Sequence, residues 1–212
     1  EIFKWIIKKP SVLSVSPSLV HVFTKSSSKL RIPDLEYVMS PASFKEGTVG
    51  LLDKISGMTL GVWQTRPKSN GYVKINSKNI HEPPIINPNY LSDPYDIDVL
   101  LKSIKIGRNL LSTSPLQPYL NGQANPSNYL QTDDELLSWA RNEGITVYHM
   151  IGTAKMGPKS DKLAVVNNKL KVRDIESLRV ADASIMPTMP SGNTNAPTMM
   201  IAEKASDMIL GK

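Results

Sequence analysis

Cysteine is missing from this 212-residue chain. Its absence excludes disulfide bonds, thiolate metal sites and a cysteine nucleophile, and it fits a reducing compartment, so we expect a cytoplasmic protein. Long apolar runs are missing as well, since no stretch of about 18 apolar residues could span a bilayer. Any chemistry in this chain must therefore depend on histidine, carboxylates, hydroxyls or a bound cofactor.

Closely spaced glycines are also missing. None of the 12 glycines has another glycine two positions away. The chain therefore has no Gly-x-Gly-x-x-Gly fingerprint, the turn that places the pyrophosphate of a dinucleotide at a helix N-terminus. If a dinucleotide binds, the chain supplies only part of the site.

Acidic residues are the minority among the charges. There are 25 lysines and arginines against 19 aspartates and glutamates, which gives a formal net charge of +6. A basic balance can indicate nucleic-acid binding, but here the lysines are dispersed along the chain. The densest run, Lys4 to Lys9, is typical of the solvated face of a short helix. We therefore expect no nucleic-acid partner.

The first part of the chain predicts a helix end and a strand. Residues 1–9 have a short amphipathic pattern that Pro10 stops, because proline lacks an N–H and forces its predecessor out of the helical region. Residues 11–31 have no helical period and predict irregular or extended surface. Residues 35–39 then alternate, which predicts a half-buried strand.

Two further strands are expected at residues 58–65 and 72–76. The segment between them ends in Asn70-Gly71, a dipeptide that favours positive φ, so we expect a turn there and antiparallel pairing of the two strands. Residues 95–111 then predict an amphipathic helix. Its apolar stripe consists of Ile97, Leu100, Leu101, Ile104 and Leu111.

A long loop and a second helix follow. Residues 112–131 are rich in proline, asparagine, glycine and serine, and this loop is longer than a simple connector. Residues 132–135, TDDE, form a capping box, in which the threonine and the glutamate bond each other's backbone N–H groups. The box opens a helix that Gly144 closes. Short strands and glycine turns follow, so we place a domain boundary near Gly144.

Two stretches near the C-terminal end combine glycines and polar residues in a distinctive order. The first, residues 148–157, reads YHMIGTAKMG; the second comprises residues 177–184, SLRVADAS, and 191–198, SGNTNAPT. Together they resemble the end of a GMC (glucose–methanol–choline) flavin oxidoreductase, and are similar to the bacterial choline and alcohol dehydrogenases of that family. The resemblance implies FAD as cofactor and an alcohol as substrate. It also implies that the chain is the last part of a longer enzyme, whose missing N-terminal part carries the dinucleotide fingerprint.

Alcohol oxidation by hydride transfer needs a base for the hydroxyl proton, a hydrogen-bond partner for the oxygen, and an electron acceptor. His149 follows the run 145–148, which could place it at a strand end before the turn at 152–153, and histidine titrates near neutrality. On position alone it could equally be a histidine with a structural hydrogen bond; the resemblance implies that it is the base. His21 and His81 are expected to lie in polar loops without a motif and to be exposed.

Asn193 and Asn195 compete for the second role. The sequence after Asn193 predicts a helix with Asn195 as N-cap, continuing to Leu210 and ended by Gly211. Because an N-cap side chain is occupied by backbone N–H groups, Asn193 has the freer amide, and the resemblance implies the same position. The reverse assignment, and a purely turn-forming role, stay open.

The resemblance implies further contacts with the cofactor. The N–H groups at the start of the helix from Asn195 carry partial positive charge, which would favour the anionic edge of a reduced flavin. Residues 178–181 predict a buried strand that ends at Asp182. The expected cofactor-binding residues are Tyr148, Asp182, Ala183, Asn195, Ala196 and Thr198.

We therefore expect an α+β (mixed α/β) fold. Residues 1–143 are expected to form a substrate-binding domain on an antiparallel sheet, and residues 144–212 the C-terminal return segment of an FAD-binding domain that carries the active-site residues. The resemblance implies FAD-dependent oxidation of an alcohol to an aldehyde or ketone, with His149 as base and Asn193 holding the substrate oxygen. The alternative is a non-catalytic binding module derived from the same substrate domain.

Overall fold

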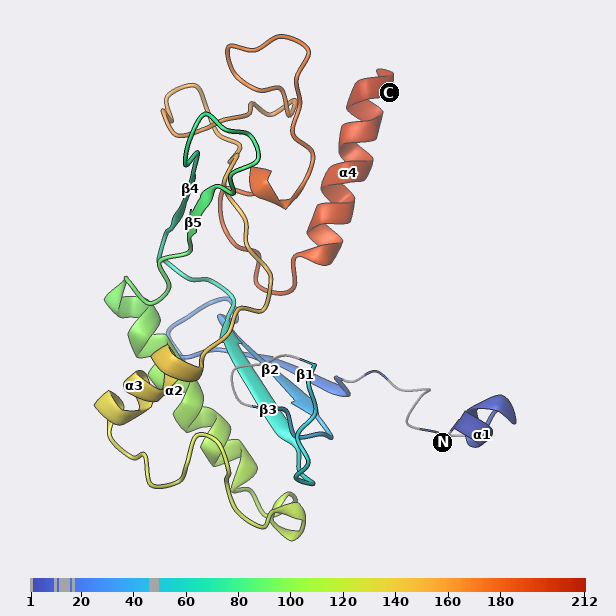
Figure 1. Ribbon diagram of the computed structural model, residues 1–212, viewed down its shortest axis with the longest axis vertical. Helices are drawn as coiled ribbons and strands as arrows, with labels where there is room; N and C mark the ends of the chain where they lie inside the picture. The colour runs from blue at the N-terminus through green and yellow to red at the C-terminus, as the bar shows by residue number, and fades with distance from the viewer. Residues whose placement is uncertain (1, 10, 12–15, 17, 46–49) are drawn as a thin grey trace. The chain divides into compact units, whose positions relative to one another are not determined.

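The computed structural model describes residues 2–9, 11, 16, 18–45 and 50–212 (Figure 1). The chain divides into two compact units, the first made of residues 1–64 and 98–145 and the second of residues 65–97 and 146–212. The short helix α1 (Ile2–Ile6) ends earlier than residue 9, and Pro10, the expected stop, lies outside the described residues.

The first unit contains a three-stranded antiparallel sheet in the order β1-β2-β3 (Figure 1). Its strands are β1 (Val20–Thr24), β2 (Leu35–Ser40) and β3 (Thr59–Gln64). β1 is an exposed strand, which agrees with the irregular or extended surface expected within residues 11–31. β2 was expected to be half-buried, but five of its six residues are buried. The central strand is covered on both faces, whereas the alternation of apolar and polar residues in its sequence predicts one solvated face.

Helix α2 (Pro94–Leu111) confirms the helix expected at residues 95–111. Within the first unit it is bonded to the sheet: the hydroxyl of Tyr37 donates to the backbone oxygen of Ser103 at 2.8 Å. Burial, and then the nearby charge of Asp34, raise the pKa of Tyr37 to about 12. Tyr37 therefore stays protonated and keeps donating. Val99, outside the expected apolar stripe, is among the most buried residues of this core.

Helix α3 (Asp133–Glu143) begins with the expected capping box. The side chain of Thr132 accepts from the N–H of Glu135, and the Glu135 carboxylate accepts from the N–H of Thr132 at 2.9 Å. Gly144 caps the C-terminal end as expected, but with a φ of −65° rather than a left-handed one. Glycine is needed there because a Cβ would lie 2.3 Å from the oxygen of Ala140.

The loop at residues 112–131 contains one short 3-10 helix, η2 (Gln117–Tyr119). It is attached to α2 through Arg108, whose guanidinium donates to the backbone oxygens of Leu130 at 2.8 Å and Ser127 at 3.1 Å. The same helix that packs on the sheet therefore also holds the end of the loop.

The second unit contains the antiparallel pair β4 (Tyr72–Lys74) and β5 (Ile85–Asn87). The expected pairing of residues 58–65 with 72–76 is wrong, because β3 pairs with β2 and β4 pairs with β5. Gly71 is also not among the residues with positive φ. It is glycine for another reason: a Cβ there would lie 2.0 Å from the oxygen of Asn87.

The core of the second unit joins helix α4 (Asn195–Leu210) to the preceding irregular segments and to the short helix η3 (Ala183–Ile185). Its buried members are Val166, Leu170, Ile185, Met186, Ile201 and Ala205. Gly211 ends α4 with a left-handed φ of 71°, as expected. The buried strand expected at residues 178–181 is wrong, since Leu178 is 46% exposed and Arg179 makes one isolated bridge, to Lys171.

Two features are absent from the described part of the chain. No helix there has the length and apolar character needed to cross a membrane. No group of three or more histidines, aspartates or glutamates there is arranged to hold a metal ion. The cytoplasmic location stays a prediction.

Candidate active site around His149

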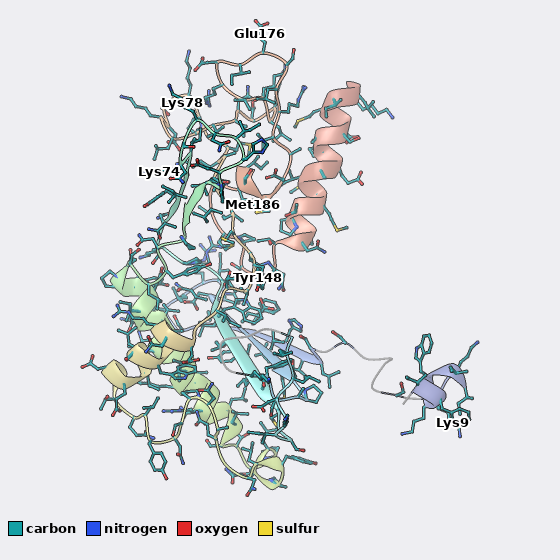
Figure 2. The ribbon with its side chains drawn as sticks, viewed as in Figure 1. Lys9, Lys74, Lys78, Tyr148, Glu176 and Met186 are labelled. Carbon is teal, nitrogen blue, oxygen red and sulfur yellow. The ribbon has the colours of Figure 1, made fainter. Side chains whose placement is uncertain are left out.

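His149 lies in an irregular segment rather than at a strand end, since residues 145–148 form no strand. Tyr148, labelled in Figure 2, has a positive φ of 59°. A bulky residue adopts this left-handed conformation rarely, at a cost of about 1–3 kcal/mol, and such strain clusters at functional sites. Gly152, with a φ of 85°, leads into a turn at residues 153–154, one residue later than the expected turn at 152–153. The backbone around the histidine is therefore held in a specific, non-repetitive conformation.

Both ring nitrogens of His149 have a partner from the segment that begins α4. The amide nitrogen Nδ2 of Asn193 lies 2.9 Å from Nε2, and Oγ1 of Thr194 lies 2.9 Å from Nδ1. An amide NH2 group can only donate, so Nε2 of His149 is the acceptor in its contact with Asn193. The structure thus brings together the two residues expected to be catalytic, although 44 positions separate them in sequence.

The accessibility of the three side chains differs. Asn193 is exposed, His149 is half-buried, and Thr194 is only 7% exposed. A small molecule could therefore reach the contact between Nε2 and the amide from solvent, whereas the contact with Thr194 is shielded. This difference in accessibility suits a base whose reactive nitrogen, Nε2, faces a ligand while Nδ1 faces the protein.

The start of α4 differs from the expectation by one residue. Thr194 occupies the N-cap position, and Asn195 is the first helical residue rather than the cap. Within the described residues the Thr194 side chain makes no capping bond, because its hydroxyl lies against His149 instead. Asn195 and Ala196 are exposed. This uncapped helix end offers backbone donors beside His149, a donor set that fits the acceptor-rich pyrimidine edge of a flavin.

The remaining residues expected to contact the cofactor also lie in this unit, but some are already engaged. Oδ1 of Asp182 accepts the N–H of Ser184 at 2.8 Å and so caps η3, while Oδ2 has no hydrogen-bond partner among the described residues. The hydroxyl of Thr198 donates to the backbone oxygen of Thr194 at 2.7 Å. Tyr148 is 72% exposed. The cofactor roles of these residues, and of Ala183, stay predictions.

Sequence reasoning missed a contact that holds the loop before Asn193. Nη1 of Arg66 donates to Oγ of Ser191 at 2.9 Å, although 125 positions separate the two residues. Arg66 belongs to the segment that the sequence indicated only as a turn. Thr194 was also missed, although its place between the two candidate asparagines was visible.

The segment that carries Arg66 is itself anchored by Asp96, a carboxylate that is 2% exposed in the first turn of α2. Its oxygens accept the backbone N–H of Lys68 at 2.9 Å and of Ser69 at 2.7 Å. In turn, Oγ of Ser69 accepts the N–H of Asp93 at 3.1 Å. Lys68 and Ser69, within the expected turn, are therefore held by bonds to a carboxylate rather than by a hairpin.

His21 is exposed, as expected, but it lies on β1 rather than in a loop. Its Nδ1 is 2.9 Å from Oε1 of Glu36, which is fully buried on β2. His81 is exposed as expected. Neither histidine is paired with an amide in the way that His149 is in the described structure.

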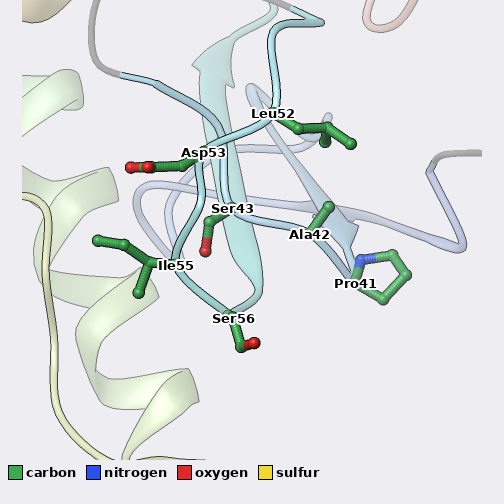
Figure 3. Close-up of a pocket in the computed structure, with 8 residues that line it drawn as sticks. Pro41, Ala42, Ser43, Leu52, Asp53, Ile55 and Ser56 are labelled. Carbon is green, nitrogen blue, oxygen red and sulfur yellow. The ribbon is translucent and has the colours of Figure 1, made fainter.

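A pocket in the first unit does not involve the histidine site (Figure 3). It is lined by Pro41, Ala42, Ser43, Leu52, Asp53, Ile55, Ser56 and Gly57. Its one ionisable group is Asp53, whose Oδ1 accepts the N–H of Lys54 at 2.6 Å. This lining contains no histidine, amide side chain or cation, so we assign it no catalytic role.

Comparisons with known proteins cover most of the chain. Residues 67–202, more than half of it, match the family model for GMC oxidoreductase. An alcohol dehydrogenase (acceptor) of Pseudomonas putida is 37% identical over 215 aligned residues, which cover 100% of this chain and 38% of that protein. An oxygen-dependent choline dehydrogenase of Staphylococcus haemolyticus (strain JCSC1435) is 36% identical, over 99% of this chain and 37% of that protein. The chain therefore spans less than two fifths of the length of these relatives.

Solved structures share the fold. A formate oxidase of Aspergillus oryzae RIB40, described for its FAD modification, superposes with a TM-score of 0.75 at 27% identity, over 89% of this chain and 33% of that one. A fungal aryl-alcohol oxidase gives a TM-score of 0.70 at 27% identity, over 85% of this chain and 28% of the oxidase chain. These likenesses confirm the mixed fold of helices and antiparallel sheet.

Proposed function

Since this chain belongs to the GMC oxidoreductase family, we propose that it is part of a longer FAD-dependent enzyme that oxidises an alcohol to an aldehyde or ketone. The observation that carries the proposal is the 2.9 Å contact between Nε2 of His149 and the amide of Asn193. The names of the relatives, an alcohol dehydrogenase, a choline dehydrogenase and an aryl-alcohol oxidase, support a substrate with a hydroxyl group. FAD is supported by the family and by the formate oxidase.

The two side chains together have the hydrogen-bonding capacity that a substrate hydroxyl requires. Nε2 of His149 accepts and Nδ2 of Asn193 donates, and at present they satisfy each other. A hydroxyl that enters can replace both ends of this bond, because its O–H donates to Nε2 while its oxygen accepts from Nδ2. His149 then takes the proton, and Asn193 stabilises the oxygen as negative charge develops on it.

FAD, when bound, would supply the acceptor for the hydride from the substrate carbon. The chain's own contribution on that side is the exposed helix end at Asn195 and Ala196, with Asp182 and Ala183 before η3. We assign Tyr148 and Thr198 to the same side of the site. These residues bind and orient, whereas His149 and Asn193 handle the proton and the oxygen.

We also propose a functional division of the chain. Residues 1–143 belong to the substrate-binding domain, which the antiparallel sheet of the first unit supports. Residues 144–212 belong to the FAD-binding domain, which the position of His149 and α4 supports. The two compact units divide the chain differently, since residues 65–97 join the second unit.

The test uses the flavin-loaded enzyme that contains this chain, with choline and a simple primary alcohol as trial substrates. His149→Ala should lower kcat by about a hundred- to ten-thousandfold, and Asn193→Asp, which removes the amide donor at constant size, by about a hundred- to a thousandfold. Both variants should keep the absorbance of bound FAD, which separates lost chemistry from lost cofactor.

His81→Ala is the matched control, because it removes an exposed histidine of the same unit and should leave kcat unchanged. Near-normal turnover of His149→Ala with full flavin occupancy would contradict the proposed function. A wild-type protein that binds the alcohols without reducing FAD would instead favour the non-catalytic binding module.

A further inference from the structure

Thr194 stands where a threonine hydroxyl normally caps a helix. At the N-cap position its oxygen would accept a backbone N–H from the first turn of α4. Instead, Oγ1 lies 2.9 Å from Nδ1 of His149 and caps nothing in the described structure. Because the residue is 7% exposed, the hydroxyl has little water to bond if it turns elsewhere. The hydroxyl of Thr194 therefore bonds the imidazole of His149 instead of capping α4.

The contact on the opposite side of the ring determines which nitrogen carries the proton. Nδ2 of Asn193 donates to Nε2, so a neutral ring has its single hydrogen on Nδ1. That hydrogen points at Oγ1 of Thr194, which accepts it. The partner of one ring nitrogen sets the tautomer of a histidine, and with it the role of the other nitrogen.

We propose that Thr194 is a positioning residue that holds His149 in the Nδ1–H tautomer. Its hydroxyl accepts from Nδ1–H and so keeps the lone pair of Nε2 directed at Asn193 and at the hydroxyl of a substrate. The inference rests on the proposed function, in which Nε2 takes the substrate proton. Thr194 itself is buried and touches the ring, not the substrate.

Thr194→Val keeps the shape of the side chain and replaces the hydroxyl by a methyl group. Nδ1–H would then face a methyl group and lose its acceptor. The ring avoids this loss by carrying its hydrogen on Nε2, while Asn193 turns its amide so that Oδ1 accepts. Nε2 is then no longer a base. We expect kcat to fall about ten- to a hundredfold, the loss found when the outer partner of a metal-bound histidine is removed, with KM little changed.

The decisive readout is the tautomer itself. The flavin-loaded enzyme is prepared with 15N-labelled histidine, and long-range proton–nitrogen correlation spectra are recorded above the titration range of histidine. The His149 signals are assigned by their loss in His149→Ala. Wild type and Thr194→Ser, which keeps the hydroxyl, should show Nδ1–H and similar kcat values, whereas Thr194→Val should show mainly Nε2–H.

Thr65→Val is the matched control. Thr65 is 3% exposed in the same unit, and its Oγ1 has no hydrogen-bond partner among the described residues. Removing this hydroxyl should leave both the tautomer and kcat as in wild type. The control separates the contact with His149 from the general effect of replacing a buried threonine.

An Nδ1–H tautomer in Thr194→Val, or a kcat within about twofold of wild type, would overturn the positioning role. Low kcat in Thr194→Ser with the wild-type tautomer would also overturn it, because the hydroxyl would then not suffice. Failure of the proposed function gives a different result: His149→Ala would keep its turnover, while the tautomer in Thr194→Val would still change.

Discussion

Removal of the Asp96 carboxylate should free the segment that carries Arg66. The carboxylate is 2% exposed and accepts the backbone N–H groups of Lys68 and Ser69 at 2.9 and 2.7 Å. A hydrogen bond to a charged group contributes about 1.5–3 kcal/mol, so Asp96→Ala should weaken the attachment of these two amides by about 3–6 kcal/mol. Asp96→Asn keeps one acceptor oxygen but presents an NH2 group to the other donor, and it should cost about half as much.

Native-state hydrogen exchange at Lys68 and Ser69 measures this change directly. A factor of ten in the opening equilibrium corresponds to about 1.4 kcal/mol, so both amides should exchange at least about a hundredfold faster in Asp96→Ala. The matched control is Asp98→Asn on the same helix, which removes an exposed pair with Lys102 at 2.6 Å. Such surface pairs contribute about 0.3–0.5 kcal/mol, too little for a comparable change.

Two outcomes would refute this reasoning. Exchange of Lys68 and Ser69 in Asp96→Ala within about threefold of wild type would mean that the carboxylate does not hold them. Equal acceleration by Asp98→Asn would mean that the effect comes from the helix as a whole. Asp96→Asn should fall between wild type and Asp96→Ala, because it loses one of the two acceptor oxygens.

Gly71→Ala should separate β4 from β5 and lower the free energy of unfolding by about 1–3 kcal/mol, because its Cβ would lie 2.0 Å from the oxygen of Asn87. Urea unfolding tests this, with Gly61→Ala as a control whose Cβ meets nothing closer than 3.8 Å. The hydrogen bond from Lys155 holds the pKa of Asp161 below its usual value. Its stabilisation is therefore complete above about pH 4 and is lost as the pH falls through the lower folded pKa. In Asp161→Asn, the free energy of unfolding should therefore fall less steeply as the pH drops below about 4. An unchanged pH dependence would contradict the stabilisation of this carboxylate by Lys155.

The helices were largely predictable because their signals are local. The capping box at Thr132 and the left-handed glycine at Gly211 mark the ends of α3 and α4 where the sequence placed them. Each signal involves residues within one turn of the helix, so no distant partner has to be known. The start of α4 was displaced by one residue, and there a distant partner was involved. Helix α1 also ended earlier than expected.

Strand pairing was predicted wrongly because it depends on distant partners. Asn70-Gly71 is a good local signal for a turn, yet Gly71 has no positive φ, and its segment bonds to Asp96 instead. In the structure, β3 pairs with β2 and β4 pairs with β5. A period of two indicates that a strand exists, but it does not identify the neighbour that completes its hydrogen bonds.

The sequence by itself determined the family and the residues of the candidate site, because His149 and Asn193 stand in ordered motifs that can be identified without coordinates. Only the tertiary structure decided how these residues meet and which nitrogen of His149 faces which partner. The physical reason lies in Thr194. Its hydroxyl could cap α4 or bond an imidazole 45 positions away. A local sequence pattern indicates the cap but carries no information about the distant imidazole.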